Sequence, residues 1–280
     1  MKNLIIILLL LPLLTNAQVI VTCAGTGTLG YTGDGHPAVD AELYYPPGVV
    51  LDDSGNLYIC DEENSCIRKV SNPANLGVGI ITTIAGNGTL GYSGDHGLGI
   101  YAQITGVDVA VDHYQNVYIA DVDNNRIRKV SFADTITTIA GTGIAGYNGD
   151  TIFADTAQLN SPTGITMDSI GNIYFTDVYN YRIRKIDTAG IITTIAGTGI
   201  LGFSPDGSHA DTAKFDGLYS IRMDKQGNLL FADNNRIRKI DSAGMITTIA
   251  GNGIIGYSGD SGLATAAEIS GGGYCFRQCG

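Results

Sequence analysis

The stretch Asn116-Val-Tyr-Ile-Ala-Asp-Val-Asp-Asn-Asn-Arg-Ile-Arg-Lys129 decides the fold, because close copies of it recur along the chain. The copies begin at Asn56, Asn172 and Asn228. In each copy an apolar segment is followed by a polar turn and by a second apolar segment, which is the pattern of two strands joined by a tight turn. The chain is therefore a tandem repeat, and the repeat separates residues that build every unit from residues that do not.

Regular segments flank this stretch in every copy. A short apolar segment ending in Asp precedes it, and an Ile-Thr-Thr-Ile-type segment ending in Ala-Gly follows it. We expect four strands per unit, at residues 49–52, 56–61, 65–70 and 80–85 in the first. Such units are typical of propeller blades, whereas β-solenoid coils are shorter and separate hairpins would be unstable. The predicted fold is all-β, a β-propeller of four complete four-stranded blades.

A long loop joins each unit to the next and keeps a fixed register. An aromatic residue stands six positions after the opening Gly, an Asp nine, an Ala sixteen and a large apolar residue eighteen. Each loop opens with Gly-x-Gly-x-x-Gly, but no helix of a βαβ unit is expected to follow and the string occurs five times. We therefore predict interblade turns and no nucleotide site. The opening glycines are Gly25, Gly86, Gly141, Gly197 and Gly251.

The repeated string Asn-x-Tyr-(Ile/Phe)-(Ala/Thr)-Asp, with Asn-Asn-Arg-Ile-Arg-Lys after it, resembles the NHL repeat. The loop string Ile-Ala-Gly-x-Gly-x-x-Gly-Tyr-x-Gly-Asp resembles exported bacterial members of that family, of the Bacteroidota type. The resemblance covers roughly Val21 to Ile269. It implies a β-propeller of a kind used mostly to bind proteins or ligands, and it says little about which ligand.

Composition and the N-terminus place the chain among acidic, exported proteins. The 280 residues are 44% hydrophobic, which is enough for a core, and carry a net charge of −11. This charge disfavours nucleic acid and anionic membranes as partners. Residues 1–17 have the pattern of a secretory signal peptide cleaved near Ala17, with Lys2 and an apolar run too short to span a bilayer. We expect no nucleic-acid partner, no membrane insertion, and a secreted protein, extracellular or periplasmic.

The two ends of the repeat do not match. Residues 18–269 are the predicted propeller, and residues 270–280 are an irregular tail in which the pattern stops. Residues 19–24 are expected to form an extra N-terminal strand, with no other strand of a blade before it. Either four blades close with this strand at the seam, or the ring is an incomplete one of five or six blades. The NHL resemblance favours the second arrangement.

Residues present in every blade are expected to build blades. We expect Asp121 and Arg126, with their copies, to form hydrogen-bonded pairs at the turn between the second and third strands, because an unpaired charge there would be costly. Asp108 and Arg222 are the unmatched charges of the first strands. The full set of predicted structural repeat residues is Asp61, Asp121, Asp177, Asp233, Arg68, Arg128, Arg184 and Arg238.

The turns between the second and third strands and the long loops are expected on one side of the propeller, the loop face. Aromatic and polar surfaces of this kind suit protein or sugar contacts. Residues of this face that do not repeat are the better ligand candidates. They are Glu62, Glu63, Asp123, Tyr179 and Tyr181.

The cysteines and cofactor motifs give weaker signals. Cys60 and Cys66 replace the Ala and Arg of other blades within one hairpin, which suggests a disulfide between the second and third strands. The histidines lack metal-ligand spacing, and no twelve-residue calcium loop is present although carboxylates are abundant. No base, nucleophile and orienting residue come together. We expect no catalytic residue and no cofactor, with calcium as the open alternative.

The predicted function is that of a secreted, non-catalytic binding or scaffold propeller with a protein or carbohydrate ligand at its loop face. Two alternatives stay open. One is a propeller hydrolase or lyase with a central metal, and the other is a fragment of a larger surface protein. The sequence does not indicate the oligomeric state.

Overall fold

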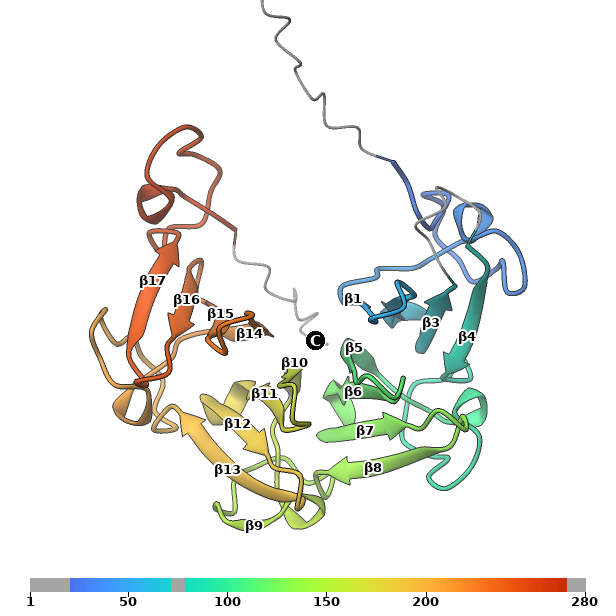
Figure 1. Ribbon diagram of the computed structural model, residues 1–280, viewed down its shortest axis with the longest axis horizontal. Coiled ribbons are helices and arrows are strands. Elements are labelled where there is room, and N and C mark those ends of the chain that lie inside the picture. The colour runs from blue at the N-terminus through green and yellow to red at the C-terminus, as the bar shows by residue number, and fades with distance from the viewer. Residues whose placement is uncertain (1–20, 72–78, 271–280) are drawn as a thin grey trace, which may run out of the picture.

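The computed structural model describes residues 21–71 and 79–270, and these fold into antiparallel sheets arranged as propeller blades (Figure 1). In each sheet the four strands follow chain order from the centre outward. The predicted all-β propeller of four four-stranded blades is therefore confirmed. Blade 1 consists of β1 (Val49–Leu51), β2 (Leu57–Asp61), β3 (Cys66–Val70) and β4 (Ile81–Ala85). Blade 2 consists of β5 (Gly106–Val111), β6 (Val117–Asp121), β7 (Arg126–Val130) and β8 (Ile136–Ala140). Blade 3 consists of β10 (Pro162–Met167), β11 (Ile173–Asp177), β12 (Arg182–Ile186) and β13 (Ile191–Ala196). Blade 4 consists of β14 (Leu218–Met223), β15 (Leu229–Asp233), β16 (Ile237–Ile240) and β17 (Ile246–Ala250).

The long loops pair with the outer strand of the blade that follows them. In blade 3 this pairing adds a short fifth strand, β9 (Ile152–Phe153), to the edge of β13. In blades 1, 2 and 4 the same contact is a single β-bridge. Each loop also carries a one-turn 3-10 helix, namely η1 (Ala38–Asp40), η3 (Gly99–Tyr101), η5 (Ala154–Thr156), η7 (Ala210–Thr212) and η8 (Ala264–Ala266). Further 3-10 helices form the turns between second and third strands, namely η2 (Glu62–Asn64), η4 (Val122–Asn124) and η6 (Val178–Asn180).

Glycine opens these loops because the backbone there excludes a side chain. Gly141 and Gly197 have φ of 92° and 95°, in the left-handed region that favours Gly. A Cβ on either residue would collide with a carbonyl oxygen of the preceding turn, that of Asn125 or Tyr181. The high glycine content therefore reflects the geometry of the interblade turns.

Apolar clusters between neighbouring blades form the core. Each cluster combines one face of a blade with the facing strands and the loop alanines of the next, so the blades are held together by burial of β-branched and aromatic side chains. Fully buried members of the three clusters include Ile67 and Ile119, Ile127 and Phe175, and Ile183 and Phe231.

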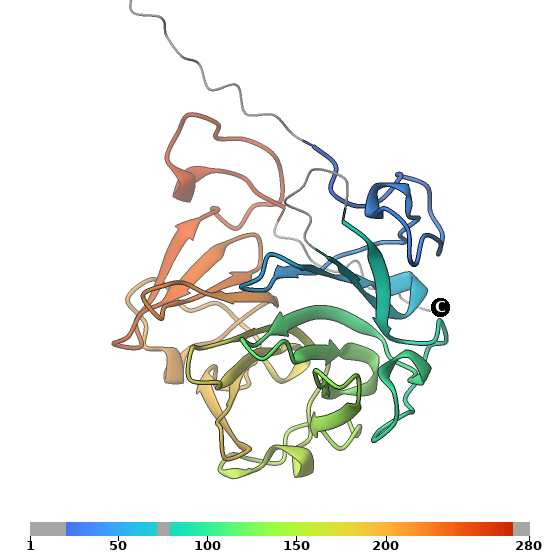
Figure 2. The ribbon, with the colours of Figure 1, turned by 45° about the vertical axis from the view of Figure 1, so that its right-hand side comes forward.

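The described blades form an arc in which blades 1 and 4 lie at opposite ends (Figure 1). Figure 2 shows the same blades from another side, again in chain order from blue in blade 1 to orange in blade 4. The expected N-terminal strand is wrong for its described part, because residues 21–24 pair with no strand. No third strand of a preceding blade lies beside them among the described residues, and Ala24 packs against the apolar cluster of blade 1 instead. The predicted tail at 270–280 and signal peptide at 1–17 lie outside the described residues except for Ser270.

Candidate functional site

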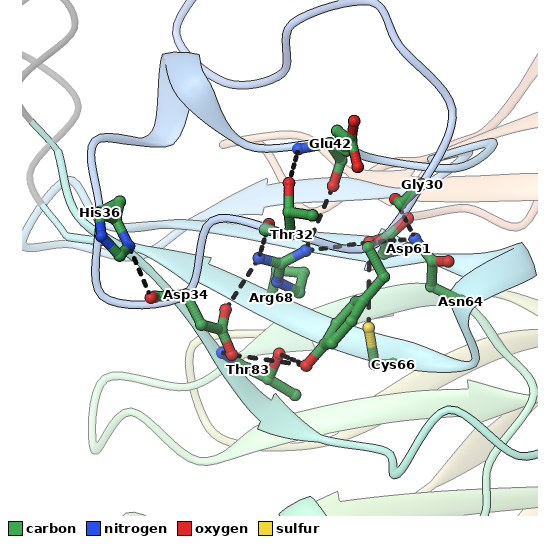
Figure 3. Close-up of polar contacts among 11 residues, drawn as sticks. Gly30, Thr32, Asp34, His36, Glu42, Asp61, Asn64, Cys66, Arg68 and Thr83 are labelled. Atoms are coloured by element: carbon green, nitrogen blue, oxygen red, sulfur yellow. Dashed lines mark hydrogen bonds and ion pairs between the residues drawn. The ribbon is translucent and has the colours of Figure 1, made fainter.

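A buried arginine on the third strand of each blade ties the preceding long loop to the blade. In blade 1, Arg68 donates to the Asp61 carboxylate at 3.3 Å and to the Asp34 carboxylate at 2.8 Å (Figure 3). It also donates to the carbonyl of Thr32 at 2.9 Å, and its guanidinium lies 4.8 Å from the ring centre of Tyr31. We call this set of contacts the arginine lock.

The arginine lock recurs in the other three blades with the same chemistry. The arginine and the strand-two aspartate are fully buried each time, and the loop aspartate is partly exposed. The eight predicted structural repeat residues therefore all lie in locks, which explains why the loops keep their register. The other locks join Arg128 to Asp121 and Asp95, Arg184 to Asp177 and Asp150, and Arg238 to Asp233 and Asp206.

The expected pair between Asp121 and Arg126 is wrong. Asp121 accepts from the backbone N–H of Thr105, from the amide of Asn124 and from Arg128. Arg126 instead donates to two carbonyl oxygens and lies 3.6 Å from the ring centre of a loop tyrosine. The two residues face each other in the strand ladder, but the Asp121 carboxylate already has its donors, so Arg126 secures the following loop.

The turns between second and third strands do lie against the long loops, as the loop face requires. Asn64 donates to the carbonyl of Gly30 at 2.7 Å (Figure 3), and Asn124 and Asn180 repeat this bond in blades 2 and 3. The five predicted ligand candidates therefore lie on turns held by the loops.

The acidic candidates lie where blade 1 meets blade 2. One oxygen of the Glu62 carboxylate is buried without a hydrogen-bond partner. Burial raises the pKa of Glu62 to about 7, with the neighbouring charges of Glu63 and Asp123 adding to the effect. Burial also raises the pKa of Asp123. The same turn position in blades 2 and 3 holds a buried valine, Val122 or Val178, so Glu62 is a carboxylate in an apolar position.

The aromatic candidates form a second group in blade 3. Tyr179 is 45% exposed, and its pKa is raised by burial and by the nearby hydroxyls of Tyr219 and Tyr181. Tyr181 ends η6 with φ of 51°, a left-handed conformation that Asn125 takes in blade 2. The structure therefore brings Tyr179 and Tyr181 together with Tyr219, which sequence reasoning had not selected.

An ion pair at the centre of the propeller was also missed from the sequence. Arg222 on β14 donates to both oxygens of Asp108 on β5, at 2.6 and 2.9 Å. Asp108 also accepts from the backbone N–H of Ile165 on β10 at 3.0 Å, so one carboxylate links blades 2, 3 and 4. The signal was present, because these were the unmatched charges of the first strands and had opposite signs.

The suggested Cys60–Cys66 disulfide is absent, and both thiols are free and buried. In the pairing of β2 with β3, Cys60 lies opposite Ile67 and Cys66 lies opposite Asp61. The two cysteines are thus one residue out of step and point to opposite faces of the sheet. Burial raises the pKa of both thiols, and the charge of Asp61 adds to this effect at Cys66, so neither thiol is activated.

Metal ligands do not converge in the part of the chain that the structure describes, where no group of three His, Cys, Asp or Glu side chains has the arrangement to hold an ion. Over residues 21–71 and 79–270, no helix is long and apolar enough to cross a membrane.

Two family models match the chain. The model of the NHL repeat matches residues 43–70, and that of the teneurin NHL domain matches residues 144–204. Together with the four-stranded blades, these matches identify the chain as an NHL-repeat β-propeller.

Individual proteins are similar to the chain. The chain is 28% identical to Teneurin-1 of Gallus gallus over 236 residues, which cover 78% of this chain and 8% of that protein. An auxiliary nutrient binding protein from Bacteroides thetaiotaomicron shares the fold, with a TM-score of 0.53, 18% identity, and coverage of 74% of this chain and 49% of that chain. A streptogramin B lyase is also similar, with a TM-score of 0.47, 17% identity, and coverage of 72% and 53%. At these identities the structural likeness concerns the fold alone.

Proposed function

We propose that the chain is a secreted, non-catalytic binding propeller, extracellular or periplasmic, that takes a protein or carbohydrate ligand on its loop face. The propeller proper spans residues 18–269, between a signal peptide at 1–17 and a tail at 270–280. The teneurin and nutrient-binding likenesses support an exported binding role. The observation that carries the proposal is the set of non-repeated side chains on turns that hydrogen-bond to the long loops.

The tyrosine group supports ligand contact through its chemistry. Tyr179 and Tyr181 present aromatic surface and hydroxyls, with few rotatable bonds to immobilise on binding. Neither side chain takes part in an arginine lock. Tyr181 is in a left-handed conformation that disfavours bulky side chains, so the fold alone does not explain a tyrosine there.

The central ion pair disfavours a metal-dependent enzyme at the axis. Asp108 is the carboxylate of the central first strands, and both of its oxygens are bound by the Arg222 guanidinium. A carboxylate so engaged is a poor ligand for a cation. A binding role at the loop face is therefore better supported than metal-assisted catalysis at the axis.

A swap between blades tests the proposal. The variant Tyr179→Asp/Tyr181→Asn gives blade 3 the residues of blade 2. Asn at position 181 tolerates the left-handed conformation. Phe132→Ser is the control, because Phe132 is 72% exposed and lies beyond the third strand of blade 2. On arrays of glycans and of extracellular protein domains, the swap should weaken binding at least tenfold and the control should not. Binding indifferent to the swap, or chelator-sensitive turnover in a hydrolase and lyase screen, would overturn the proposal.

A further inference from the structure

The turn between β5 and β6 departs from the repeat at its third position and carries two aromatic rings before it. It reads His113-Tyr114-Gln115, and in every other blade the third of these positions is Gly. Gln115 has φ of 63°, in the left-handed region where Gly171 and Gly227 have 96° and 81°. Strained non-glycine residues concentrate at functional sites, and here the strain accompanies two aromatic rings that no other blade has at this turn.

These residues border a hollow on the side of the propeller opposite the loop face. The turns between first and second strands of blades 1, 2 and 3 enclose about 550 Å³, within the range of about 300–1,000 Å³ typical of small-molecule sites. Tyr114 is 67% exposed, and its ring centre is 3.7 Å from that of His113. Met167 and Ile170 add apolar wall. We call this site the turn hollow.

The charges that line the turn hollow restrict its ligand. Three carboxylates line it and no lysine or arginine does, so anionic ligands are disfavoured. Lys129 lies outside the lining, with its ammonium 5.4 Å from the ring centre of Tyr118 on the wall. A phosphate or a carboxylate ligand would therefore be repelled by the three carboxylates of the lining.

Only one of the three carboxylates is open to a ligand. Both oxygens of Asp112 and of Asp168 accept hydrogen bonds, from N–H donors of their own turns and from a tyrosine O–H of the strand that follows. Asp53 is exposed at the rim and makes no ion pair among the residues that the structure describes. A cation would thus find a single available carboxylate, which is too few to hold it. A polyol needs only one strong acceptor, a hydroxyl and an aromatic surface to stack on. Ser169 supplies the hydroxyl.

We propose that the turn hollow binds a neutral saccharide of one or two rings. The apolar face of one ring stacks on Tyr114, and its hydroxyls donate to the carboxylate of Asp53 and exchange hydrogen bonds with Ser169. The site is independent of the loop face, because the turns that form the two faces lie at opposite ends of the strands.

The test uses the full chain and a defined panel of probes. Cellobiose, lactose, chitobiose and glucose are titrated at millimolar concentrations, with binding followed by saturation-transfer NMR. Tyr114→Ser gives the turn the residue of blade 1, and Tyr101→Ser is the matched control because Tyr101 is 69% exposed on a loop outside the hollow. We expect at least one probe to bind, with a tenfold or greater loss for Tyr114→Ser, a comparable loss for Asp53→Asn, and none for the control.

Three results would overturn the proposal: no probe binds, a probe binds equally well to Tyr114→Ser, or choline and an arginine peptide bind in place of the sugars. Because Tyr114 is exposed, its substitution should leave the fold intact, and circular dichroism of each variant checks this. The loop-face swap Tyr179→Asp/Tyr181→Asn should leave saccharide binding intact, so failure of one site is distinguished from failure of the other.

Discussion

Replacing Glu62 by valine should stabilise the protein above pH 7 and change its stability little at pH 4. Glu62 places a carboxylate oxygen without a hydrogen-bond partner where blades 2 and 3 bury valine. Burial and the adjacent acids raise its pKa from 4.5 to about 7. Below pH 4.5 the side chain is protonated in both the folded and the unfolded chain and carries no electrostatic penalty. As the pH rises to 7, the unfolded chain ionises first, so stability is lost.

The magnitude follows from the difference between the two pKa values. A difference of about 2.5 corresponds to about 3.4 kcal/mol at about 1.36 kcal/mol per pH unit. Because Glu62 is only partly buried, solvent screening reduces the expected penalty to about 1.5–2 kcal/mol. The valine variant should recover this amount at pH 8 and differ from the natural sequence by less than about 1 kcal/mol at pH 4.

Urea unfolding followed by circular dichroism at pH 4, 5, 6, 7 and 8 measures the effect. The chain has no tryptophan, so the backbone signal is the suitable probe. Glu62→Gln serves as the charge-only control and should remove the pH dependence without the gain from apolar packing. Glu63→Gln tests the neighbouring charge, and its effect should be smaller. A stability difference between Glu62→Val and the natural sequence that is the same at pH 4 and pH 8 would refute the reasoning.

Three further predictions test the other structural claims. Arg128→Met should lower the free energy of unfolding by about 3–5 kcal/mol, because it leaves a buried carboxylate unpaired, whereas Arg126→Ala should cost about 1 kcal/mol in the same urea titration. Gln115→Gly should raise the melting temperature, since relieving one left-handed residue contributes about 1 kcal/mol; an unchanged or lower value would contradict the strain. Arg222→Met should destabilise the chain by about 2 kcal/mol because the buried Asp108 carboxylate loses its charged partner, and Asp108→Asn in the same background should recover part of that loss.

The architecture was predictable because the chain supplies its own alignment. Once the four copies of the strand–turn–strand stretch are set in register, alternation of apolar residues places the strands. Invariant offsets in the loops likewise require a fixed contact, which proved to be the arginine lock. The arginine that pairs with Asp121 was harder to predict. Arg126 and Arg128 both lie on the strand next to Asp121, so the sequence allows either pair. The decision rests on which side chain lies beneath the loop, and the sequence carries no direct measure of that.

Residues that depart from the repeat could be recognised in the sequence, but the contacts that they make could not be predicted from it. Asp108 and Arg222 were recognisable as unmatched charges, yet the 114 positions between them gave no sign that the curvature of the propeller joins them. Cys60 and Cys66 shared a hairpin, and only the strand register shows that they face opposite ways. The turn hollow was missed because its walls come from three separate turns, each of which is unremarkable as a single segment.

Two positions depart from their copies in a way that should oppose the stability of the fold. Glu62 replaces a buried valine on the loop face, and Gln115 replaces a left-handed glycine beside the turn hollow. A residue that only builds a blade should converge on the type that the other blades use at that position, because the local geometry is the same. Restoring Val at 62 and Gly at 115 should therefore stabilise the chain. If these positions serve ligands, each restoration should weaken binding at its own face and leave the other face unaffected. Gains in stability without any loss of binding at either face would instead assign both departures to drift.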